Sequence, residues 1–313
     1  MFEGSPTVTD YVVVTGAYDH KDEKSTRPLV EFTYPRKIHR DIWITQIDHT
    51  LCDALLDACE PRGENFKPVR QYGCAYALYR ENALADPHQQ SRFDADGALY
   101  KCVALSRLVH PTSVGFETAA RIRQWPGGTR EIIPAGRSTL NASAYVIAPN
   151  ENWLVPDDLP LLRDLLDALH SAPLPRRLES ALWHHETAAR QYFIDLRWTL
   201  LTTSLEALVR IKDERLPSRR FAGSTQVFVD RLLAIGNMDG TLAVEEAELR
   251  EMYAQRSLLT HGLAFGTLDE EHKAVYRAQE RLVRGILRKA FLDLSFRDIF
   301  GSDMSIATRL PLR

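Results

Sequence analysis

The hydrophobic residues of this chain change their period near residues 150–156, and this change restricts the fold more than any other feature of the sequence. Before it, several segments alternate apolar and polar residues, most clearly RDIWITQID at residues 40–48. Such alternation is typical of half-buried β-strands. After it, apolar residues recur every three or four positions, as in amphipathic helices. Strands followed by helices predict an α+β protein.

The same change predicts two domains. We expect a β-rich domain at residues 1–150 and a helical bundle at residues 151–313. The first domain has no phosphate loop or dinucleotide fingerprint, so by elimination we interpret it as a recognition or regulatory module whose trigger or partner stays open. Its pattern predicts one helix, at residues 51–59. Strands are predicted at residues 11–17, 29–34, 41–47, 72–80, 101–109, 119–125 and 144–148.

The second half reads as a succession of helices. The first begins at residue 157 or 158 and is broken by residues 174–175, and the most hydrophobic one, at residues 193–211, suits the centre of a bundle. We predict an irregular tail from residue 301. The remaining helices are expected at residues 176–190, 225–235, 245–261 and 269–294.

Composition excludes several classes of protein. A net charge of -3 argues against a protein that coats nucleic acid non-specifically, so any RNA contact must come from a local patch. No apolar run approaches the ~18 to 20 residues of a membrane span, and the first residues lack a signal-peptide pattern, so we expect a cytoplasmic protein without membrane contact. The cysteines show no CxxC spacing, which favours structural thiols and no metal site.

One charged residue interrupts the apolar stripe of the helix at residues 245–261. At about 100° per residue, Leu249, Met252 and Tyr253 gather on one side, and Arg256 falls among them. An unpaired buried charge costs several kcal/mol, so Arg256 needs a carboxylate partner, a route to solvent or an anionic ligand. His261 follows five positions later, and Gly262 is suited to the position after a helix end.

The segment RSLLTHG, residues 256–262, resembles the signature of the HEPN family, in which Arg is followed after four to six residues by His within a small helical bundle. Upstream, LTTSLEALVRI at residues 201–211 is similar to the helix that precedes this segment in the Apea-like HEPN branch. A long final helix follows, so the resemblance covers about the last half of the chain.

The resemblance implies a metal-independent endoribonuclease that needs no cofactor. RNA cleavage by 2'-hydroxyl attack requires a base, an acid and a cation for the charge on the phosphorane. His261 would serve as acid and base, and Arg256 would bind phosphate. Family members act as dimers with the site at the interface, so two copies would supply two of each residue. A toxin or antiphage effector acting on RNA is the implied role.

Several alternatives stay open. Arg256 would have a purely structural role if it held a buried ion pair with Glu206 or another carboxylate. Glu206 would orient Arg256 or His261 in a site, or it would form an i,i+4 pair with Arg210. Ser257 stands where many catalytic members carry Asn, Asp or His, which favours a non-catalytic HEPN module that binds RNA or nucleotide and dimerises as a scaffold or sensor.

Four arginines lie in one row on the predicted final helix, within about 60° of each other and opposite its apolar face. A row of this kind can follow a phosphate backbone, so these residues are our candidates for RNA binding. The other interpretation is a solvated helix face. The four are Arg277, Arg281, Arg284 and Arg288.

Overall fold

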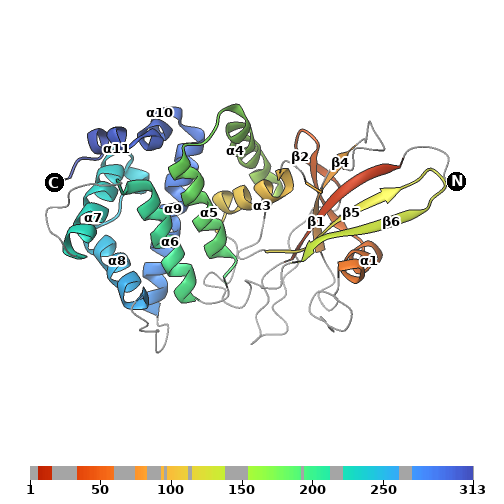
Figure 1. Cartoon of the computed structure of the whole chain (residues 1–313), viewed down its shortest axis with the longest axis horizontal. Coiled ribbons are helices and arrows are strands. Elements are labelled where there is room, and N and C mark those ends of the chain that lie inside the picture. The colour runs from red at the N-terminus through yellow and green to blue at the C-terminus, as the bar shows by residue number, and fades with distance from the viewer. Residues whose placement is uncertain are drawn as a thin grey trace. The chain divides into compact units, whose positions relative to one another are not determined.

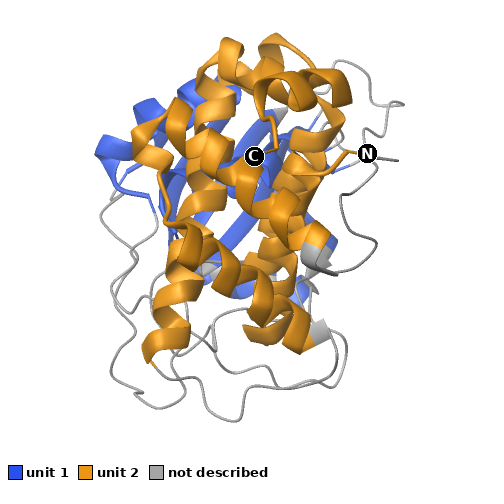
Figure 2. Ribbon diagram, turned by 90° about the vertical axis from the view of Figure 1, so that its left-hand side faces the viewer, with its two compact units in different colours: residues 1–166 blue, residues 167–313 orange. Residues whose placement is uncertain are grey.

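The computed structural model describes residues 6–15, 34–59, 75–82, 93–94, 97–111, 115–137, 154–191, 194–211, 221–260 and 270–312 (Figure 1). The chain forms two compact units, residues 1–166 and 167–313 (Figure 2). The domain boundary predicted after residue 150, and the strands predicted at residues 29–34 and 144–148, fall wholly or almost wholly outside the described residues.

Unit 1 is built on a six-stranded antiparallel sheet, which confirms the β-rich first half of the predicted α+β fold. Its strand order is β2-β3-β4-β1-β5-β6. The central strand contains three consecutive valines, Val12, Val13 and Val14, that are fully buried, as expected where both faces of a sheet are covered. The strands are β1(Thr7–Thr15), β2(Arg36–His39), β3(Ile42–Ile47), β4(Ala75–Asn82), β5(Gly115–Gln124) and β6(Arg130–Arg137).

Two helices, α1(His49–Cys59) and α3(Ala98–Val109), pack against this sheet. Leu55 of α1 belongs to the same core cluster as Val13 of β1. Asp10 of β1 accepts a hydrogen bond from the Asp94 N–H, and the Asp94 carboxylate accepts bonds from the N–H groups of Leu99 and Tyr100 in the first turn of α3. Side chains alternate between the two faces of a strand, so Asp10 and Val13, three positions apart on β1, point to opposite faces of the sheet. Helix α1 packs on the Val13 face and the first turn of α3 is held on the Asp10 face, so the two helices cover opposite faces (Figure 1).

The prediction of a strand at residues 101–109 is wrong, because these residues lie in helix α3. The sequence KCVALSRLV carries no clear helical stripe, since nearly the whole helix is buried, including Arg107 and Ser106. A helix covered all round loses the amphipathic pattern that identifies a surface helix. Strand β6 was not predicted from the sequence.

Unit 2 is helical, as predicted, and α6 is in contact with α5, α7, α8 and α9. Its side chains Trp198, Leu201, Leu205 and Leu208 are almost fully buried. The division between the units falls within α4(Leu159–Ser171), which follows η2(Pro156–Asp158). The remaining elements are α5(Arg176–Ala189), α6(Ile194–Val209), α7(Phe221–Met238), η3(Gly240–Leu242), α8(Glu246–Thr260), α9(Glu270–Leu292), α10(Leu294–Arg297), η4(Asp298–Gly301) and α11(Asp303–Arg309).

The tail is helical where the sequence predicted irregular structure. Helix α11 begins after Ser302, whose hydroxyl accepts a hydrogen bond from the Ser305 N–H at 3.1 Å. Ile306 and Leu310 are buried and hold it in place. A helix of seven residues is too short to show a repeated stripe, so packing decides its structure. Across the described ranges, no helix combines the length and apolar character that a membrane span requires.

Candidate functional site

Arg256 lies on the side of α8 that faces the bundle, where the sequence placed it. Leu249, Met252 and Tyr253 on the same side of α8 are buried. The side chain of Arg256 is 25% exposed, so it keeps partial contact with solvent, although its Nε is buried. It therefore differs from a core residue sealed in the interior.

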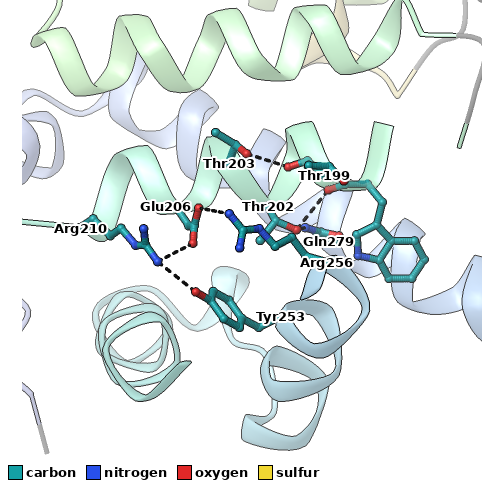
Figure 3. Close-up of polar contacts among 9 residues, drawn as sticks. Thr199, Thr202, Thr203, Glu206, Arg210, Tyr253, Arg256 and Gln279 are labelled. Carbon is teal, nitrogen blue, oxygen red and sulfur yellow. Dashed lines mark hydrogen bonds and ion pairs between the residues drawn. The ribbon is translucent and has the colours of Figure 1, made fainter. Parts of the chain in front are cut away.

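Glu206 of α6 is the acidic partner of Arg256. Its side chain is only 8% exposed, and its Oε2 lies 3.4 Å from Arg256 Nη2 (Figure 3). Its Oε1 lies 2.9 Å from Nη2 of Arg210, the residue that follows the end of α6. The two pairings considered from the sequence therefore coexist, and one carboxylate is shared by two guanidiniums.

Tyr253 completes this group on α8, one turn before Arg256. Its hydroxyl accepts a hydrogen bond from Arg210 Nη2 at 3.0 Å, and its ring centroid lies 5.9 Å from Arg256 Cζ (Figure 3). Burial and the negative charge of Glu206 raise the pKa of Tyr253, so its phenol stays protonated at neutral pH. The sequence treated Tyr253 only as a core residue; its spacing of three from Arg256 was the available signal.

We call Glu206, Arg210, Tyr253 and Arg256 the Arg256 cluster. Two guanidiniums against one carboxylate give it a formal charge of +1. A partly exposed, positively charged cluster suits an anionic ligand such as a phosphate.

A buried polar contact beside the cluster ties α9 to α6. Gln279 Nε2 of α9 donates a hydrogen bond to the Thr202 hydroxyl at 2.7 Å, and that hydroxyl donates to the Trp198 carbonyl at 3.1 Å (Figure 3). Both side chains are fully buried. These bonds fix the side of α9 that faces α6, and the sequence did not identify them.

His261, the second residue of the predicted motif, lies outside the described residues, as does Gly262. Helix α8 ends at Thr260. The place of His261 relative to the Arg256 cluster therefore stays a prediction. Within the described ranges, no group of three or more His, Cys, Asp or Glu side chains could hold a metal ion.

The four arginines predicted to bind RNA do not all lie in the same environment. Arg281, Arg284 and Arg288 line a groove formed by α9, η3 and α10. Arg277 is not among the residues that line it and lies 3.7 Å from Glu270 in an exposed ion pair. At about 100° per residue the four point about 140–200° away from Gln279, so the row and the Arg256 cluster lie on opposite sides of α9.

No family model, curated protein or solved structure matches this chain.

Proposed function

We propose that this protein is a metal-independent endoribonuclease of HEPN type, with Arg256 and His261 as its catalytic residues. The main support is the geometry of Arg256. Its side chain faces the bundle yet remains a quarter exposed, and the buried Glu206 holds Nη2. An arginine fixed in this way and open to solvent on one side can bind a phosphate.

The proposed reaction begins when His261 removes the proton of the RNA 2'-hydroxyl. The 2'-oxygen attacks the adjacent phosphorus, and the bond to the 5'-oxygen breaks. The second His261 of a homodimer protonates this leaving oxygen. Arg256 stabilises the negative charge that develops on the phosphorane. The products are a 2',3'-cyclic phosphate and a 5'-hydroxyl. The reaction consumes no oxidant and needs no cofactor.

Glu206 acts in this proposal as a positioning residue. It is held between Arg210 and Arg256, so it limits the rotamers of Arg256 without neutralising the cluster. Tyr253 provides an aromatic surface beside the guanidinium and does not titrate near neutral pH. The β-rich unit then serves as a recognition or regulatory module.

The test is cleavage of end-labelled RNA by the purified full chain in EDTA, beside the Arg256→Ala and His261→Ala variants. We expect each variant to cut at least about 100-fold more slowly than wild type, as removal of an acid/base or a charge-stabilising donor usually does. An all-deoxyribose strand of the same sequence should stay intact, because it lacks the attacking hydroxyl.

The matched control is Arg250→Ala. Arg250 is also on α8, but its guanidinium is exposed and binds Glu246 and Gln226 away from the cluster. It should cut RNA as wild type does, and circular dichroism should show all three variants folded at the assay temperature. Wild-type rates in both Arg256→Ala and His261→Ala would overturn the proposal. RNA binding without cleavage by wild type would instead indicate the non-catalytic HEPN module.

A further inference from the structure

A groove on the outer side of α9 combines positive charge with exposed apolar surface. It has a volume of about 1140 Å³ and is formed by α9, η3, the residues that precede and begin α8, and the start of α10. This volume lies slightly above the ~300 to 1,000 Å³ typical of small-molecule sites.

Two cations in the groove have no acidic partner among the residues that the structure describes. These are Arg281 and Arg288, which lie two turns apart on one side of α9. The other two cations are paired. Arg284 Nε lies 3.1 Å from Glu280, and Lys289 Nζ lies 3.3 Å from Asp239 and 3.2 Å from Asp293.

The acidic residues of the groove are already engaged in helix capping. Asp239 accepts hydrogen bonds from the N–H and hydroxyl of Thr241, and Glu248 accepts one from the Glu245 N–H. Asp293 accepts bonds from Ser295 and Phe296 and pairs with Lys289, and these contacts lower its pKa to about 2. The groove lining has four cations and three carboxylates, a formal charge of +1, and Arg281 and Arg288 are the two cations that no described carboxylate holds.

The apolar part of the groove lies toward its α10 end. Leu292 and Leu294 are 47% and 64% exposed there, which is unusual for leucine in a hollow. Buried Leu242 lies beneath, held against α9 at Gly285, where an added Cβ would come within 2.7 Å of Leu242 Cδ2. A ligand that fits both parts carries phosphate at one end and a planar or apolar body at the other.

We propose that this groove binds nucleotide, with the phosphates at Arg281 and Arg288 and the base or sugar against Leu292 and Leu294. The ligand is either a free nucleotide or a nucleotide unit of an RNA strand, which share this chemistry. The site is separate from the Arg256 cluster, since Arg281 and Arg288 point about 180–200° away from Gln279 at ~100° per residue. It does not depend on ribonuclease activity.

Calorimetric titration of the full chain at low salt tests this, with ADP, adenosine and a short all-deoxyribose oligonucleotide as probes. We expect ADP, the oligonucleotide or both to bind, and adenosine to bind at least tenfold more weakly because it lacks phosphate. Arg281→Ala/Arg288→Ala should weaken binding about 100-fold, since each charge-assisted contact contributes about tenfold. Binding of ADP alone identifies the free nucleotide as the ligand, and binding of the oligonucleotide alone identifies the strand.

Two single variants locate the site. Arg277→Ala is the matched control, because Arg277 belongs to the same row but lies outside the groove lining, and it should bind as wild type does. Arg250→Ala, which lies on α8 outside both the groove lining and the Arg256 cluster, should also bind as wild type does. The proposal is overturned if no probe binds, if the double variant binds normally, or if either single variant weakens binding as much as the double variant does. Cleavage is not measured, so failure here leaves the ribonuclease proposal untouched.

Discussion

At the scale of single residues, the Arg256 cluster rests on one carboxylate that serves two arginines. Glu206 is nearly buried, whereas Arg210 is about half exposed and Arg256 a quarter exposed. Removing the carboxylate would leave two guanidiniums close together without the negative charge that they share. The cost of such a change falls mainly on Arg256, since Arg210 can turn toward solvent.

We therefore predict that Glu206→Gln lowers the free energy of unfolding by about 1 to 3 kcal/mol. Glu206→Gln/Arg256→Gln should cost less than the sum of the two single changes, because the double variant removes the uncompensated charge as well as the pair. Urea unfolding of the four proteins measures the coupling.

Glu246→Gln provides the control for this cycle. Glu246 forms an exposed i,i+4 pair with Arg250 on α8, so its loss should cost less than about 0.5 kcal/mol. Equal unfolding energies for Glu206→Gln and Glu246→Gln would show that the shared carboxylate does not stabilise the cluster.

At the scale of elements, the sheet of unit 1 contains an ion pair between its central strands. Arg121 of β5 donates two hydrogen bonds to Asp10 of β1, at 2.6 and 2.8 Å, and the two side chains are 6% and 1% exposed. Asp10 also accepts the Asp94 N–H, which places the cap of α3 beside the sheet. One buried carboxylate thus links two strands and the start of a helix.

Asp10→Asn should lower the free energy of unfolding by about 3 to 5 kcal/mol, because it removes the charge that Asp10 sets against the buried Arg121. The comparison is Glu131→Gln, which breaks the pair between Glu131 of β6 and Arg123 of β5 at 3.4 Å on a more exposed part of the sheet. That change should cost less than about 1 kcal/mol. Chemical denaturation followed by circular dichroism measures both, and similar losses would contradict the role given to Asp10.

At the scale of the whole molecule, the proposed reaction needs two copies of the chain. Each copy supplies one His261 and one Arg256, and two proton transfers need two imidazoles. Under this proposal the active species is a homodimer, and activity depends on the concentration of chains.

Adding His261→Ala protein to a fixed amount of wild type should lower the cleavage rate, because mixed dimers hold one His261 instead of two. Excess variant should bring the rate close to zero once subunits have exchanged. Sedimentation at the assay concentration confirms that the chains are dimers. An unchanged rate, in dimers shown to exchange, would mean that one chain carries a complete site.

Local patterns in the sequence predicted much of this organisation. The change from period two to a helical period predicted the α+β fold, which is confirmed. The spacing of Leu249, Met252, Tyr253 and Arg256 predicted that Arg256 faces the bundle, and it does. These features depend only on the rise and turn of a strand or helix, which the neighbouring residues determine.

Only the tertiary structure decided which distant residues meet. It brought Glu206 to Arg256 across fifty positions of sequence, made residues 101–109 a buried helix, and placed three of the four α9 arginines in a groove with Leu292 and Leu294. The sequence alone determined which side of each helix is apolar or charged. The packing of elements far apart in the chain determined what that side contacts, because such contacts depend on how whole helices and strands fit together.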